Sequence, residues 1–311
     1  MTSAPPERTG LRDPRILLPF LLITLIWSST WIVIKDQLGI VPPVWSVSYR
    51  FLIAGAAMMA IARLAGGSLA IGRGHGLAAL LGLLQFVLNY NFVYASELYI
   101  TSGLAAVVFA LLVVPNAGLA WLLFGEKVSL RFMLGSAVAM AGVGLLFLQE
   151  IRNSPTPTAE TLTGLGLALL AVLAASVSNV MQLAGGMKSL PIAPMLAWAM
   201  LYGGLMDAAF AWATVGAPVI ETDWRYWLGL IYLGVVASAL AFWLYYRIIR
   251  AIGPAKAAYS SVLIPIIAMA LSTLFEDYRW SALAVAGGLL AIAGLIIALR
   301  SGRGAPPPPE P

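Results

Sequence analysis

The chain has no cysteine and very little charge for its length. Of its 311 residues, 10% are charged and one is histidine, whereas 61% are hydrophobic. The absence of cysteine excludes disulfide bonds, thiolate metal sites and cysteine nucleophiles. A soluble domain needs roughly a quarter of its residues charged to keep its surface in water. The composition therefore predicts that lipid is the main solvent of this protein.

Apolar segments long enough to cross a bilayer, about 20 residues each, recur along nearly the whole chain. We predict ten transmembrane helices, at residues 16–34, 43–64, 76–96, 102–124, 131–149, 162–184, 194–214, 225–246, 256–275 and 281–299. They leave a polar tail at 1–15, one polar connection at 150–161 and a proline-rich tail at 301–311. The predicted fold class is all-α, a polytopic membrane protein.

The distribution of lysine and arginine predicts the orientation of these helices. With the N-terminus in the cytoplasm, 13 of the 18 Lys and Arg residues fall in cytoplasmic segments. Four fall in outer loops, and Arg50 lies within a span. Because cytoplasmic loops of membrane proteins are enriched in Lys and Arg, we expect both termini in the cytoplasm. The basic residues are scattered singly, which argues against a nucleic-acid partner despite the net charge of +5.

The two halves of the chain are related to each other. An offset of 150 residues pairs Gly103 with Gly253, Pro115 with Pro265, Glu126 with Glu276 and Gly144 with Gly294. Each proline lies in mid-span, and each glutamate follows it by eleven residues. Five spans per half is an odd number, so the second half, 162–300, must be inverted relative to the first, 16–149. Inverted repeats around a midplane site are typical of secondary transporters.

One stretch of the first half carries a family resemblance. Residues 95–148, with Pro115, a following Gly125-Glu126 and a glycine-rich last helix, resemble the EamA-type repeat of the drug/metabolite transporter superfamily. Residues 27–31 (Trp-Ser-Ser-Thr-Trp) with Lys35 are similar to the first-helix motif of that repeat. The resemblance implies ten helices, with two inverted five-helix halves around a central cavity, and we expect the protein to be a monomer. The resemblance also implies the export of aromatic and other neutral amino acids across a bacterial inner membrane.

Polar and aromatic side chains at membrane depth are expected to face the interior of the bundle, because they are costly in hydrocarbon. The candidate substrate-binding residues are Trp27, Ser28, Thr30, Trp31, Gln85, Asn89, Tyr90, Ser176, Asn179, Ser238, Trp243, Tyr259 and Ser260. Neutral amides suit the carboxylate and ammonium groups of an amino acid, and aromatic walls suit its side chain. For each residue, the alternative is a hydrogen bond between neighbouring helices.

Four further residues within spans have two interpretations each. Pro115 and Pro265 each free a backbone carbonyl, so they are either hinges of the transport cycle or tolerated kinks. Arg50 could attract a substrate carboxylate or extend outward as an interfacial anchor, and we favour the anchor. Asp207 is the candidate for proton coupling, unless it pairs with a neighbouring helix.

Three classes of function remain to be compared. An amino-acid exporter fits the neutral candidate residues, whereas an exporter of cationic drugs or other metabolites is the alternative. A cation carrier would favour a buried carboxylate in a core helix, and the predicted spans 1, 3, 4, 6 and 9 contain none. A membrane-embedded enzyme is disfavoured because paired acids, a His–acid pair and a Ser/His dyad are absent from the spans. We expect no cofactor and no metal, and as partners only the lipid bilayer and small-molecule substrates.

Overall fold

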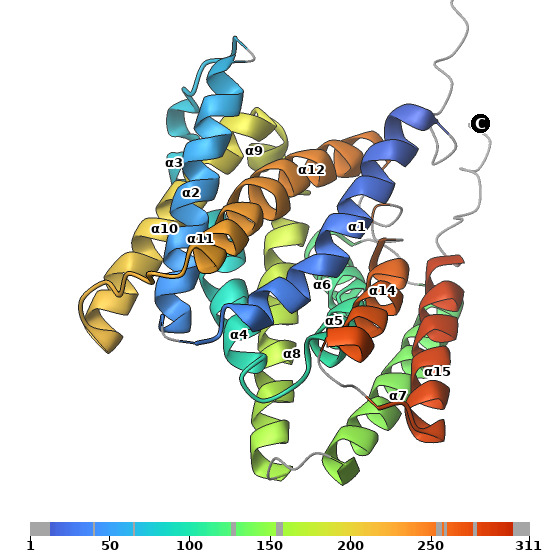
Figure 1. The fold of residues 1–311 in the computed structure, drawn as a ribbon. Coiled ribbons are helices and arrows are strands. Elements are labelled where there is room, and N and C mark those ends of the chain that lie inside the picture. Colours follow the sequence, from blue (N-terminus) through green and yellow to red (C-terminus); the bar gives the residue numbers. More distant parts are fainter. Residues whose placement is uncertain are drawn as a thin grey trace, which may run out of the picture.

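A computed structural model shows the chain as a bundle of helices (Figure 1). It describes residues 13–39, 41–64, 66–125, 129–153, 158–252, 257, 260–275 and 279–300. The α-helices are α1 (Pro14–Asp36), α2 (Pro43–Leu64), α3 (His75–Leu81), α4 (Asn89–Ser96), α5 (Ser102–Ala110), α6 (Val113–Phe124), α7 (Leu130–Asn153), α8 (Thr158–Met181), α9 (Gly185–Lys188), α10 (Ile192–Val215), α11 (Trp224–Ile231), α12 (Ala241–Ile252), α14 (Ser260–Phe275) and α15 (Ala282–Arg300). The described residues contain no β-strand, so the predicted all-α class is confirmed.

Seven helical segments are long and apolar enough to cross a membrane. They are Pro14–Asp36, Pro43–Leu64, Gly72–Ser96, Ser102–Phe124, Ala159–Met181, Ile192–Val215 and Trp224–Ala251. Each overlaps one of the predicted spans. The other three predicted spans overlap α7, α14 and α15, which are apolar helices of 24, 16 and 19 described residues.

Two of the membrane segments contain a stretch of π-helix. These stretches are Gly82–Leu88, between α3 and α4, and Tyr232–Leu240, between α11 and α12. A π-helical turn is wider than an α-helical turn, so some carbonyl groups become available to other donors. The carbonyl of Ala237 accepts a 3.2 Å hydrogen bond from the indole nitrogen of Trp27 on α1. The π-helical stretch thus fixes the position of an aromatic side chain on a distant helix.

The two candidate hinge prolines lie in different backbone settings. The segment Ser102–Phe124 is interrupted at Leu111 and Leu112, just before Pro115, and is divided there into α5 and α6. Proline has no amide hydrogen to continue the helical ladder, and the carbonyl of Leu111 accepts instead from the amide of Val114 at 2.8 Å. Pro265 lies inside the uninterrupted helix α14. Only the first of the two prolines coincides with a break in its helix.

The helices pair in a regular manner around two central elements. Helix α2 packs against α10, α5 against α14, and α7 against α15. Helix α1 crosses the middle of the bundle, where it packs against α12, α14 and α5 (Figure 1). Helix α8 packs correspondingly against α4, α5 and α6. The inner faces of these central helices carry the residues of the candidate site.

Candidate functional site

A cavity of about 910 Å³, with the open space at its mouth included, lies between the central helices. Its walls come from α1, α4, α5, α6, α8, α12, α14 and the π-helical stretch before α4. The lining residues are Trp27, Thr30, Trp31, Ile34, Gln85, Asn89, Tyr90, Val93, Ala106, Phe109, Ala110, Leu112, Val113, Asn116, Ala175, Asn179, Phe242, Tyr245, Ser260, Ile264 and Pro265. None of these described lining residues carries a charge. The cavity therefore suits a solute that is neutral overall or that brings both signs of charge.

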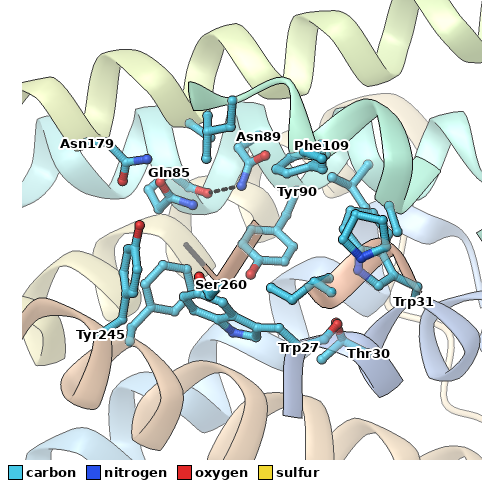
Figure 2. Close-up of a pocket in the computed structure, with 18 of the residues that line it drawn as sticks. Trp27, Thr30, Trp31, Gln85, Asn89, Tyr90, Phe109, Asn179, Tyr245 and Ser260 are labelled. Carbon is cyan, nitrogen blue, oxygen red and sulfur yellow. Dashed lines mark hydrogen bonds between the residues drawn. The ribbon is translucent and has the colours of Figure 1, made fainter. Parts of the chain in front are cut away.

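Three amide side chains gather on one wall of the cavity. Figure 2 shows Gln85, Asn89 and Asn179 close together there. The amide nitrogen of Asn89 donates to the backbone carbonyl of Gln85 at 3.2 Å, and the hydroxyl of Ser178 on α8 donates to the side-chain oxygen of Gln85. These bonds restrict the rotamers of both amides. The wall therefore presents fixed neutral dipoles to the cavity.

The opposite wall is aromatic and is built on α1. Figure 2 shows Trp27 and Trp31 facing the amides across the cavity. The ring of Trp27 lies edge-to-face with Phe242 and Tyr245, at centroid distances of 5.5 and 4.9 Å. Trp31 meets Phe109 edge-to-face at 5.2 Å. Edge-to-face packing is the preferred geometry of aromatic pairs, so this wall is a rigid apolar surface.

Three buried polar atoms at the cavity have no hydrogen-bond partner among the described residues. They are the indole nitrogen of Trp31 and the side-chain oxygens of Asn89 and Asn116. A buried polar group without a partner costs roughly 1–3 kcal/mol. A ligand with both an acceptor and donors would remove part of this cost. Beside its other polar groups, the cavity wall thus contains one donor and two acceptors that have no partner among the described residues.

Eight of the thirteen candidate substrate-binding residues line this cavity. They are Trp27, Thr30, Trp31, Gln85, Asn89, Tyr90, Asn179 and Ser260, and the candidate hinge Pro265 joins them. Ser28 and Ser176 are fully buried outside the lining, and the hydroxyl of Ser28 donates to the carbonyl of Thr24 at 2.6 Å. The ring of Trp243 lies under the guanidinium of Arg247 at 4.6 Å. Tyr259 lies outside the described residues.

Arg50 and Ser238 form a buried pair beside the cavity. The Arg50 side chain is fully buried, and its Nε donates to the hydroxyl of Ser238 at 3.0 Å. The guanidinium carbon lies 4.4 Å from the ring centroid of Tyr90, which lines the cavity. The interpretation of Arg50 as an interfacial anchor is therefore wrong, because the side chain turns into the bundle rather than toward the membrane surface.

Asp207 is also fully buried, but it is not a lining residue of the cavity. Its Oδ1 accepts a 2.6 Å hydrogen bond from the amide nitrogen of Asn91, which joins α10 to α4. Across the described part of the chain, no three His, Asp or Glu side chains lie close enough together to hold a metal ion. The described lining residues supply hydrogen bonds and apolar surface.

Among the lining residues that sequence reasoning missed, four are polar or aromatic: Phe109, Asn116, Phe242 and Tyr245. Asn116 follows Pro115 directly, and a polar residue at membrane depth was the available signal. Phe242 and Tyr245 come just after the π-helical stretch Tyr232–Leu240. That stretch rotates the following residues relative to a regular period of 3.6, so the sequence alone does not tell which aromatic side chain faces inward.

The comparison with known proteins agrees with this architecture. Residues 15–148 and 162–300 each match the EamA-like transporter family. The chain is 24% identical over 290 residues to Protein PagO of Salmonella typhimurium, with 93% of each chain covered. It is 24% identical over 292 residues to a probable amino-acid metabolite efflux pump of the same organism, with 89% of this chain and 92% of the relative covered. It is 28% identical over 284 residues to the uncharacterized inner membrane transporter YedA of Escherichia coli K12, with 88% of each covered.

A solved crystal structure shares the fold. It superposes with a TM-score of 0.70 at 20% sequence identity and covers 94% of this chain and 98% of its own. The family match extends over nearly all of the helical bundle, in two consecutive segments. This protein is a multi-pass membrane transporter that belongs to the EamA-like transporter family.

Proposed function

We propose that this transporter exports amino acids, aromatic and other neutral ones, across the inner membrane of a bacterium. The observation that carries the proposal is the cavity itself, in which fixed amides face a rigid aromatic wall and no described lining residue is charged. Amides can accept from an ammonium group and donate to a carboxylate, whereas an aromatic wall accommodates side chains of different size. Two relatives named as an amino-acid metabolite efflux pump and an inner membrane transporter support the substrate class and the location.

The arrangement that we propose for export is ten transmembrane helices in two inverted halves, 16–149 and 162–300. Helices α7, α14 and α15 would complete the set of ten. Three observations support the inversion. The two π-helical stretches begin 150 residues apart, at Gly82 and Tyr232. Helix α1 packs against α12 and α14, as α8 packs against the corresponding helices α4 and α6. These two helices also run in opposite directions along the bundle (Figure 1).

Inverted halves provide a simple mechanism for transport. Both halves contribute walls to the cavity: α1, α4, α5 and α6 from the first, and α8, α12 and α14 from the second. Rocking of one half against the other would open the cavity to one side of the membrane at a time. The break before Pro115 and the proline within α14 are the candidate hinges of this movement.

Transport by the purified protein in liposomes tests the substrate class. Uptake of labelled tryptophan and leucine is measured beside uptake of a cationic dye, with and without a pH gradient. We expect saturable uptake of both amino acids above the level of protein-free liposomes, and no uptake of the dye. Uptake of the dye without either amino acid would refute the proposal and favour a multidrug exporter.

A substitution in the cavity wall tests whether the transported amino acid binds in this cavity. Asn116→Leu replaces a buried acceptor with an apolar side chain of similar volume. We expect the KM for leucine to rise about tenfold, because one hydrogen bond to the solute is lost. Thr222→Ala, in an exposed loop, is the control and should leave the KM unchanged. An unchanged KM in Asn116→Leu would show that the solute binds elsewhere.

A further inference from the structure

Arg50 is a charged side chain in the interior of a membrane transporter. It is fully buried on α2, and its guanidinium lies against the aromatic faces of Tyr90 and Phe51, at 4.4 and 5.4 Å. Its Nε donates to Ser238, whereas its Nη1 has no hydrogen-bond partner within the described protein. The guanidinium also interacts electrostatically with the phenol of Tyr94. The side chain is therefore held mainly by neutral groups.

Among the described residues, Arg50 has no ion-pair partner that would neutralise its positive charge. In the portion of the chain that the structure describes, no carboxylate forms a salt bridge with it; its contacts are a hydroxyl and aromatic rings. Burying a charge is expensive unless it is paired, and charged residues inside membrane segments usually have a functional reason. Aromatic faces offset part of this cost but do not cancel the charge.

The position of Arg50 connects this charge to the cavity. Tyr90 lines the cavity and also covers the guanidinium, so one side chain separates the charge from the solute. In a low-dielectric interior, an unneutralised charge acts over a longer distance than in water. The neutral walls of the cavity do not screen it. The charge of Arg50 would therefore add a positive contribution to the potential in the cavity, which no described lining residue supplies.

We propose that Arg50 is the residue that selects for a free carboxylate on the transported solute. Its charge favours a zwitterion or an anion over the same molecule without a carboxylate, and it opposes the entry of organic cations. The proposal rests on the proposed function as an amino-acid transporter and narrows it. The amides and aromatic rings of the walls would hold the ammonium group and the side chain, whereas Arg50 supplies the preference for the acid.

A matched series of competitors tests this proposal in liposomes. Leucine, leucine amide and the amine formed by decarboxylation of leucine share one side chain and differ at the carboxyl position. We expect leucine to inhibit the uptake of labelled leucine at least about tenfold more strongly than either analogue in the wild type. We call the factor by which leucine inhibits more strongly than an analogue the selectivity ratio. In Arg50→Gln, which removes the charge, this ratio should fall to within about threefold.

Two further variants separate charge from structure. Arg50→Lys keeps the charge and should retain most of the wild-type ratio. Tyr90→Phe keeps the aromatic cover over the guanidinium and should also retain it. If Arg50→Gln does not yield folded protein, Arg50→Met is the neutral replacement. If that variant also fails to fold, Arg50→Lys decides. This variant keeps the positive charge, so a loss of the preference for leucine in it would overturn the proposal.

The outcomes distinguish this proposal from the proposed function. Wild-type liposomes that take up no amino acid would refute the function itself. If amino acids are carried but the three competitors are equally strong, the function stands and the role of Arg50 is refuted. The same conclusion follows if Arg50→Gln transports leucine with an unchanged ratio. A ratio that is lost in Arg50→Gln and kept in Arg50→Lys supports the proposal.

Discussion

Asp207 is a buried carboxylate whose position favours a role in helix pairing. A carboxylate inside a membrane segment is by default a candidate for proton transfer. Asp207, however, is not a lining residue of the cavity, and its hydrogen-bond partner is Asn91 on the neighbouring helix α4. Asn91 also donates to the carbonyl of Val87 in the π-helical stretch. These contacts connect α10 to an irregular part of the third membrane segment.

The variant Asp207→Asn separates pairing from proton coupling. Asparagine keeps an oxygen that can accept from Asn91, so we expect uptake within about twofold of the wild type and the same response to a pH gradient. The measurement is leucine uptake in liposomes with an imposed gradient. If the wild type responds to the gradient and Asp207→Asn does not, Asp207 is the coupling residue and the pairing interpretation is wrong.

At the scale of residues, the sequence predicts which types of side chain line the site better than it predicts their directions. Gln85, Asn89 and Trp27 could be selected because polar and aromatic groups at membrane depth seek the interior. Ser28 satisfies the same criterion but bonds within its own helix. The burial of Arg50 could not be read from the sequence, since it depends on Tyr90 and Ser238, which lie far away along the chain.

At the scale of elements, the pair α7 and α15 shows how glycine permits close backbone contact. A Cβ atom added at Gly142 would lie 2.3 Å from the amide nitrogen of Ala291, and one at Gly294 would lie 2.2 Å from that of Ala139. Real Cβ atoms do not approach a backbone so closely. A Cβ atom added at Gly144, two residues after Gly142, would meet no other group within 4 Å. The contact between these helices therefore depends on particular glycines.

The variants Gly142→Ala and Gly144→Ala form a matched pair for this contact. Overpacking costs about 1–3 kcal/mol, so we expect Gly142→Ala to lower the unfolding temperature in detergent. Gly144→Ala should leave that temperature unchanged or raise it, because alanine is favoured over glycine in a helix by about 1 kcal/mol. Thermal unfolding of the two purified variants gives the comparison. Equal temperatures would show that α7 and α15 do not pack as described.

Helix positions could be predicted from hydrophobic length, but irregularities inside helices could not. The predicted spans 43–64 and 102–124 coincide with segments of the structure to the residue. The interruption at Leu111 has a local signal in Pro115. The π-helical stretches have no such signal, because they form where a helix adapts to its neighbours. At Gly82, for example, the neighbouring helix α10 is so close that an added Cβ atom would lie 2.5 Å from the carbonyl oxygen of Ala199.

At the scale of the whole molecule, the distribution of charge and the position of helix α10 together predict the orientation in the membrane. This helix has 24 residues, so its ends lie about 36 Å apart. Near its start, Trp198 donates to the carbonyl of Leu69, which places the loop between α2 and α3 at that end. Thr222 lies in the loop that follows its other end. The two loops therefore lie at opposite ends of α10, and we expect them on opposite sides of the membrane.

The absence of cysteine makes this orientation directly measurable. Single cysteines introduced by Ser68→Cys and Thr222→Cys would be the only thiols in the protein, and both positions are exposed. Because Lys and Arg are concentrated on the side of Ser68, we expect an impermeant maleimide to label Thr222→Cys in intact cells. It should label Ser68→Cys only after the cells are permeabilised. The reverse pattern would place the N-terminus outside, since two spans separate it from Ser68, and would contradict the predicted orientation.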